Sequence, residues 1–143
     1  MIYHRKRRYL VHAQAFTTEG LLIFSAPTFT FEDNVEPDEL GRAIVAALDA
    51  FRSGVRHPRT SAEWKAVLAA LLALGGVKTY STFCRSARCV SIEEESGRVV
   101  LTPTRNLGAR GGFDPDLANQ LFTTRDDPAR LGAAVVEACR LST

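Results

Sequence analysis

The sequence predicts a single α+β domain over residues 1–143, in which an antiparallel β-sheet packs with about three α-helices. Three observations support this fold class. Alternating apolar residues indicate strands near the N-terminus and at residues 88–104, helical apolar stripes begin at Pro37 and Pro128, and a long apolar segment lies between them. The composition, 45% hydrophobic and 24% charged residues, is that of a folded chain with a sizeable core.

The first strands are expected before residue 32. Residues 8–16 alternate in a way that predicts a strand with one well-covered face. Residues 21–24 and 28–31 are expected to form two further extended pieces, separated by a turn at Ala26-Pro27.

The first and last helices are both expected to start at proline, a residue favoured at the first helical position. The helix that begins at Pro37 carries acidic residues in its first turn, where the helix dipole favours anions, and Gly54 offers a stop. The helix that begins at Pro128 has Asp127 available as its cap.

These two helices also share the pattern P-x-x-L-G-x-A-x-V-x-A, preceded at the same distance by Phe31 and Phe122. Either a structural duplication or convergent helix chemistry accounts for the repeat. In both cases Gly41 and Gly132 are expected to allow a close approach to the structure beneath them.

A middle helix is expected between Thr60 and Gly75-Gly76, because Thr60 and Glu63 have the spacing of a capping box. Its leucines and alanines wrap almost all round, so we expect it to be the centre of the core. The apolar run at residues 66–77 is well short of the roughly 20 residues needed to cross a bilayer, so no membrane span is expected.

Residues 88–104 predict a β-hairpin that turns at Ser96-Gly97. The glycine-rich segment LTPTRNLGARGGF at residues 101–113 follows. Its glycines, Gly108, Gly111 and Gly112, match neither the Walker spacing nor GxGxxG, so a wide turn is predicted in place of a phosphate cradle. Arg105 and Arg110 would be exposed cations there.

The basic segment HRKRRY places Arg5, Lys6, Arg7 and Arg8 together. No continuous apolar core follows it, so a secretory signal is not expected and we expect a cytoplasmic protein. The basic residues either guard an exposed strand edge or, with Arg105 and Arg110, make phosphate contacts in a small RNA-associated protein. A net charge of only +2 and the lack of an aromatic platform favour the first alternative.

No catalytic or metal-binding pattern is present. The three histidines, His4, His12 and His57, lie in no recognisable motif. Cys84, Cys89 and Cys139 form no CxxC pair, and we expect reduced, packed thiols. A nucleophilic Cys84 or Cys89, with a pKa lowered by Arg85 and Arg88, is the alternative. We therefore expect no enzyme activity, cofactor or metal.

The second half of the chain resembles a known family. The features are the tryptophan helix that begins WKAVLAALLALGG, the segment S-x-F-x-R-x-A at residues 81–87, the hairpin with TPTRN, the GGF turn and the helix LGAAVVEA. Their order and spacing from Pro37 onward resemble the CdiI immunity proteins of bacterial contact-dependent growth inhibition systems.

The resemblance implies a cytoplasmic protein that performs no catalysis and binds a cognate toxin domain, commonly a nuclease. Neither membrane binding nor direct nucleic-acid binding is implied. Because a nuclease has a cationic substrate channel, its inhibitor is expected to present carboxylates. From charge alone, the candidate partner-binding residues are Glu93, Glu94, Glu95, Asp114 and Asp116.

Overall fold

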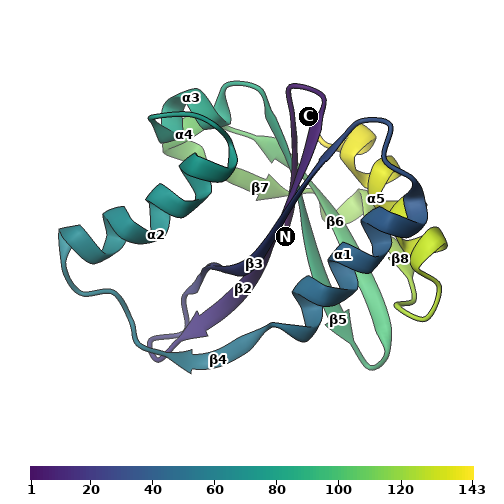
Figure 1. The fold of residues 1–143 in the computed structure, drawn as a ribbon, viewed down its shortest axis with the longest axis horizontal. Coiled ribbons are helices and arrows are strands. Elements are labelled where there is room, and N and C mark those ends of the chain that lie inside the picture. The colour runs from purple at the N-terminus through teal and green to yellow at the C-terminus, as the bar shows by residue number, and fades with distance from the viewer.

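The computed structural model describes residues 1–143 and confirms the α+β fold class, with one sheet, three long helices and two short ones (Figure 1). The strands are β1 (Ile2–Arg5), β2 (Arg8–Thr17), β3 (Leu22–Glu32), β4 (Arg52–Val55), β5 (Ala87–Glu95), β6 (Arg98–Asn106), β7 (Phe113–Pro115) and β8 (Leu121–Thr123). The helices are α1 (Pro37–Asp49), α2 (Ser61–Leu74), α3 (Tyr80–Cys84), α4 (Gly108–Gly111) and α5 (Pro128–Leu141), with a 3-10 turn at Leu117–Asn119.

The helix starts lie where the sequence predicts them. Pro37 and Pro128 begin α1 and α5, and the Asp127 side chain accepts a hydrogen bond from the backbone N–H of Arg130 at 3.0 Å. The capping box of Thr60 and Glu63 is complete at the start of α2. The stop at Gly54 is wrong: α1 ends at Asp49, and Gly54 lies in β4, which pairs in parallel with β2.

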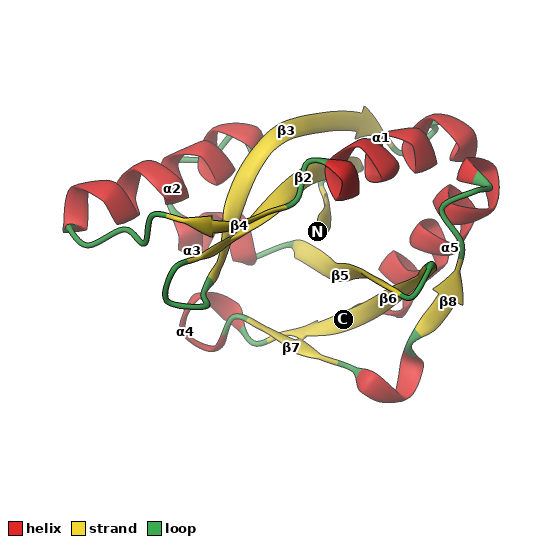
Figure 2. Cartoon of the chain, turned by 90° about the horizontal axis from the view of Figure 1, so that it is seen from below, coloured by secondary structure: helices red, strands yellow, loops and turns green.

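The sheet is built from two antiparallel ribbons joined by one short strand. Its order is β3-β2-β1-β5-β6-β7, and β8 also pairs with β6. β1 contributes only four residues. Its first residue, Ile2, pairs with Val11 of β2 and Val90 of β5, and its last, Arg5, pairs with Arg8 and Ala87. Beyond the Ile2 end of β1, the β2–β3 ribbon and the β5–β6 ribbon diverge (Figures 1 and 2).

The two faces of the sheet carry two separate cores. α1 and α5 cover the larger one, with 15 buried residues, and α2 and α3 cover the smaller one, with seven. The prediction that the middle helix is the centre of the core is wrong, because Leu71 is the only buried residue of α2 and Trp64 is 37% exposed. The helix is apolar on all sides, so its sequence does not show that only one narrow face contacts the sheet.

The basic N-terminal segment forms a hairpin of β1 and β2, whose turn residues Lys6 and Arg7 both have positive φ. Arg5 is not a surface cation, because it is only 5% exposed. Its guanidinium donates hydrogen bonds to the backbone carbonyls of Phe83 at 3.1 Å, Thr82 at 3.1 Å and Gly75 at 3.3 Å. Arg5 therefore fastens α3 and the end of α2 to the sheet.

The two extended pieces expected at residues 21–24 and 28–31 belong to one strand, β3 (Leu22–Glu32), and no turn separates them. His12 of β2 pairs with Thr28, but the next residue, Ala13, pairs with Ser25. Ala26 and Pro27 therefore have no partner on β2 and form a bulge. β3 is the edge strand of the sheet, where the missing N–H of a proline is tolerated.

The hairpin predicted at residues 88–104 is confirmed as β5 and β6, and its turn residues Ser96 and Gly97 both have positive φ, as a tight hairpin turn requires. The glycine segment that follows is more ordered than the wide turn predicted. Residues 108–111 form the helical turn α4, after which Gly112 donates to the carbonyl of Gly108 at 2.8 Å. The chain then pairs back onto β6 as β7.

α1 and α5 approach each other through the two glycines of their shared pattern. A Cβ added to Gly41 would lie 1.8 Å from the carbonyl oxygen of Pro128, and one added to Gly132 would lie 1.9 Å from that of Pro37. The expected close approach is confirmed, and the structure beneath each glycine is the first turn of the other helix.

Candidate functional site

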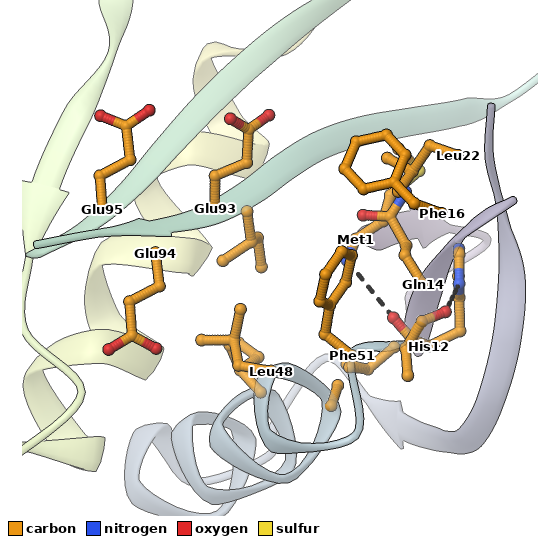
Figure 3. Close-up of a pocket in the computed structure, with 15 residues that line it drawn as sticks. Met1, His12, Gln14, Phe16, Leu22, Leu48, Phe51, Glu93, Glu94 and Glu95 are labelled. Atoms are coloured by element: carbon orange, nitrogen blue, oxygen red, sulfur yellow. Dashed lines mark hydrogen bonds between the residues drawn. The ribbon is translucent and has the colours of Figure 1, made fainter. Parts of the chain in front are cut away.

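A pocket of about 510 Å³ lies where the two ribbons diverge (Figure 3). One wall is β2 from Val11 to Phe16, the other is β5 from Ile92 to Glu95, and the second half of α1 contributes apolar side chains. β1 begins at Ile2, so its pairing with β2 and β5 does not extend between the two walls of the pocket. We refer to it as the inter-ribbon pocket.

The pocket is largely apolar and has aromatic residues at its mouth. Ile44, Ala47 and Leu48 of α1 line it, together with Phe16 and Phe51. The rings of Phe16 and Phe51 contact each other edge to face at a centroid distance of 5.7 Å, yet they remain 41% and 44% exposed. Exposed aromatic residues beside an apolar pocket are typical of a surface that binds another molecule.

The three glutamates of β5 all line this pocket, but they point in different directions. Glu93 and Glu95 project to one side of the strand and Glu94 to the other, as alternation along a strand requires (Figure 3). Glu94 accepts a hydrogen bond from Arg125 at 3.0 Å, and Arg125 also pairs with Asp49 of α1. These interactions, first of all the hydrogen bond to Asp49, raise the pKa of Arg125.

No basic side chain pairs with Glu93 or Glu95. The N-terminal ammonium of Met1 lines the same pocket: burial lowers its pKa to about 6, and the negative charge of Glu93 opposes that shift. The hydroxyl of Ser91 donates to Glu93 at 3.2 Å, which leaves the other carboxylate oxygen free. Both glutamates are exposed. Of the three, therefore, Glu93 and Glu95 are available to a partner, while Glu94 joins β5 to the loop before α5.

The edge of β5 that borders the pocket is unpaired. Pairing with β1 ends at Val90, so residues 91–95 have β6 as their only strand neighbour. On the opposite wall, Met1 and His12 exchange backbone hydrogen bonds, with distances of 3.2 and 3.3 Å. Backbone N–H and C=O groups of β5 are thus left facing the opening, where an extended segment can pair with them.

Asp114 and Asp116 lie elsewhere. Asp114 pairs with Arg105 across β6 and β7, and Asp116 accepts a hydrogen bond from Asn119 at 2.8 Å. Asp114 opposes Arg105, whereas Glu93 opposes Val100, so five residues of β6, about 17 Å, separate the two acidic groups. The structure brings the three glutamates together and leaves the two aspartates apart from them.

Most of the basic residues that the RNA alternative requires are buried or paired with acidic residues of the protein itself. Arg5 is buried, Arg7 and Arg8 lie 3.4 and 3.5 Å from Asp33 and Glu32, and Arg105 pairs with Asp114. Arg5 in particular cannot reach a phosphate. The basic segment of the sequence is therefore a hairpin in which Arg5 is buried and Arg7 and Arg8 have acidic partners, whereas Lys6 makes no ion pair.

The structure contradicts the lowered thiol pKa on which the alternative of a nucleophilic Cys84 or Cys89 depends. Cys84, Cys89 and Cys139 are free and buried. Burial raises the pKa of all three thiols, to about 12 for Cys89 and Cys139, so the arginines nearby do not produce a thiolate at neutral pH. No cluster of three or more metal-binding side chains is present, and no helix is long and apolar enough to cross a membrane.

His12 is a buried histidine that sequence reasoning did not single out. Its ring lies between Tyr3 and Phe24, at centroid distances of 5.8 and 4.5 Å, and Nδ1 donates to the carbonyl of Ala13 at 2.7 Å. Nε2 is buried without a partner. Burial lowers the pKa of His12 to about 3, so the ring is neutral at physiological pH and serves as a packing residue beside the pocket.

Sequence reasoning found the pocket glutamates but missed its aromatic residues. Phe51 fits the apolar stripe of the first helix, but it follows the end of α1 and is exposed. Phe16 looks like the last residue of a strand. Only the pairing of distant strands shows that the two rings meet.

Comparisons with known proteins agree with this architecture. A solved structure described as a protein of unknown function, NMB0488 from Neisseria meningitidis, is similar with a TM-score of 0.81 and 16% identity, covering 99% of this chain and 93% of that one. A CdiA-CT/CdiI toxin and immunity complex from Yersinia pseudotuberculosis is similar with a TM-score of 0.78 and 15% identity, covering 99% and 95%.

At such identities the two structures establish a common fold. No curated protein sequence gives a significant match. The family model of CdiI, the CDI immunity protein, matches residues 1–142, which is almost the whole chain. The chain therefore belongs to the CdiI family of CDI immunity proteins.

Proposed function

We propose that residues 1–143 form one immunity domain that binds and neutralises a cognate CdiA toxin domain, a nuclease, in the bacterial cytoplasm. Membership of the CdiI family supports this role, and one of the similar structures is a complex of a CdiA toxin with its immunity protein. The protein acts by stoichiometric binding, so no step of the proposed function requires a catalytic group.

The inter-ribbon pocket is the proposed binding site. The observation that carries this proposal is the coincidence, at one opening, of an apolar pocket, two exposed aromatic rings, two unpaired carboxylates and an unpaired strand edge. Apolar anchors supply most of the affinity of a protein interface, whereas charges set its orientation and association rate.

Each group has a distinct role. Phe16 and Phe51 hold an apolar anchor of the toxin, the free edge of β5 pairs with an extended toxin segment, and Glu93 and Glu95 contact its cations. Glu94 acts indirectly, by holding Arg125 and thereby the wall of the pocket. Asp114 and Asp116 remain candidates for a second contact, although Arg105 already neutralises the first.

Charge explains how a mildly basic protein can block a nuclease. The net charge of +2 does not attract a cationic toxin, so the attraction must be local. Glu93 and Glu95 provide it, because charges at the mouth of a low-dielectric pocket act on an approaching partner within about one Debye length, roughly 8 Å. Occupation of the cationic channel then excludes the nucleic-acid substrate.

The test first identifies the gene next to that of this chain and uses the C-terminal toxin domain of the CdiA protein expected there. Co-expression of the chain is expected to restore growth of cells that produce the toxin, and calorimetry is expected to give a 1:1 complex. Absence of both protection and binding rejects the function. Protection that is unchanged when Glu93, Glu95, Phe16 and Phe51 are all replaced rejects the site.

A further inference from the structure

A second cavity, of about 300 Å³, lies at the other end of the sheet, beneath α5. It is lined by His4, Tyr9 and Arg88 of the sheet, by Asp33 after β3, and by Val136, Cys139 and Arg140 of α5. We refer to it as the α5 cavity. It shares no residue with the inter-ribbon pocket.

Strand register builds the floor of this cavity. His4 pairs with Tyr9 on β2 and with Arg88 on β5, so the three side chains stand in a row across adjacent strands. The rings of His4 and Tyr9 are in contact at a centroid distance of 4.8 Å. Arg140, near the end of α5, adds a second guanidinium from the helix that covers this row.

The carboxylate of Asp33 already has partners in this cavity, whereas Arg88 and Arg140 keep free N–H donors. The carboxylate of Asp33 pairs with His4 at 2.5 Å and with Arg7 at 3.4 Å. Arg88 makes no ion pair or side-chain hydrogen bond, and Arg140 makes only one contact, with Glu137 at 3.4 Å. The hydroxyl of Tyr9 also lacks a protein partner, although the residue is only 6% exposed.

Arg88 has no carboxylate partner and Arg140 has only Glu137, at 3.4 Å, so the two guanidiniums offer several free N–H donors to an anion that lies between them. The carboxylate of Asp33 lines the same cavity, but His4 and Arg7 engage it. A phosphoryl group has enough oxygens to accept from both guanidiniums and from a phenol, and its charge offsets theirs. Burial raises the pKa of Tyr9, so its hydroxyl keeps its proton and remains a donor at neutral pH.

We propose that the α5 cavity binds a single phosphoryl group, held by Arg88 and Arg140 from two sides and by the hydroxyl of Tyr9. This site shares no lining residue with the inter-ribbon pocket proposed to bind the toxin. The phosphoryl group comes from free phosphate or from the monophosphate of a nucleotide, since both present the same terminal oxygens.

The test is a titration of the ¹⁵N-labelled protein with inorganic phosphate, followed by amide NMR, with sodium chloride adjusted to keep the ionic strength constant. Saturable shifts are expected at His4, Tyr9, Arg88 and Arg140. Arg88→Gln and Arg140→Gln are each expected to weaken binding about tenfold or more, because each removes a charged hydrogen-bond donor. Arg130→Gln is the matched control, since Arg130 is exposed on the same helix and has no ion pair.

Tyr9→Phe provides a third variant that removes only the hydroxyl, and it keeps the proposal testable if an arginine variant does not fold. Shifts that do not saturate, or that are the same in Arg88→Gln, Tyr9→Phe and wild type, overturn the proposal. A parallel titration with adenosine monophosphate distinguishes the sources: tighter binding than phosphate indicates a nucleotide, and equal binding indicates free phosphate.

Discussion

Gly41 and Pro128 are in such close contact that no larger side chain fits between α1 and α5: a Cβ on Gly41 would lie 1.8 Å from the Pro128 carbonyl oxygen. Gly132 and Pro37 repeat this contact in the opposite direction, at 1.9 Å. The two helices that cover the main core are thus locked together at their first turns, and the position of α1 sets one wall of the inter-ribbon pocket.

Gly41→Ala and Gly132→Ala are each expected to destabilise the protein by about 3 kcal/mol or more, because the obstacle is backbone and the helices must separate. Urea unfolding measures the change. Ala133→Ser, which adds one atom at an exposed position of α5, is the control and is expected to stay within about 0.5 kcal/mol of wild type. Wild-type stability in both glycine variants would contradict the close packing.

Arg5→Ala is expected to cost about 3 kcal/mol, because it leaves three backbone carbonyls without their donor and loosens α2 and α3 from the sheet. Hydrogen exchange is expected to accelerate in α2 and α3 more than in α1 and α5. Arg7→Ala removes a side chain of the same hairpin that is 87% exposed, and it is expected to change little. Uniform acceleration of exchange in both variants would contradict this role of Arg5.

The neutral state of His12 predicts a pH dependence of stability. The pKa of His12 in the folded protein is lowered from 6.5 to about 3 by burial. The unfolded chain therefore binds the proton as the pH falls below about 6.5, and the folded state loses stability through the whole interval down to about 3. Between pH 7 and pH 5 this loss amounts to about 2 kcal/mol.

His12→Phe is expected to remove that part of the pH dependence and to keep the aromatic stack between Tyr3 and Phe24. Unfolding free energies at pH 7 and pH 5 for the two proteins give the comparison. An equal loss in wild type and variant would show that His12 is not the group responsible.

Removal of the free carboxylates is expected to slow toxin association. The double variant Glu93→Gln, Glu95→Gln should lower the association rate about tenfold at low salt and reduce its salt dependence, with a smaller change in dissociation. Stopped-flow measurements at several salt concentrations test this. Glu39→Gln, an exposed glutamate of α1 without a hydrogen-bond partner, is the control.

Removal of the aromatic rings is expected to raise the dissociation rate of the toxin complex, and not to lower its association rate. Phe16→Ala and Phe51→Ala should each weaken the toxin complex by about 2 kcal/mol, because they remove apolar anchors, and should alter folding stability far less because both rings are exposed. Surface plasmon resonance and urea unfolding separate the two effects. If each variant loses as much unfolding free energy as binding free energy, the rings act in the core of the protein and not as anchors for the toxin.

Local chemistry explains which parts of this structure the sequence could predict. The starts at Pro37 and Pro128 and the capping box of Thr60 with Glu63 depend on neighbouring residues, and all three are confirmed. The hairpin of β5 and β6 likewise depends on the residues at its own turn. These features need no knowledge of the rest of the chain.

The missed features depend on residues that are far apart in the sequence. The acceptors of Arg5 lie 70 to 78 residues away, so its charge alone suggested a surface position. β1 is too short and too basic to show a strand pattern. The inter-ribbon pocket lies beside the start of β1 at Ile2, and its walls come from strands and a helix that are far apart in the sequence.

The four-residue length of β1 has an evolutionary consequence. The walls of the opening are the free ends of two ribbons, and the packing that maintains the fold lies behind them in the helix-covered cores. Side chains at the ribbon ends can change without repacking those cores. Two solved structures share this fold at 15–16% identity, so the scaffold tolerates sequence change at most of its positions.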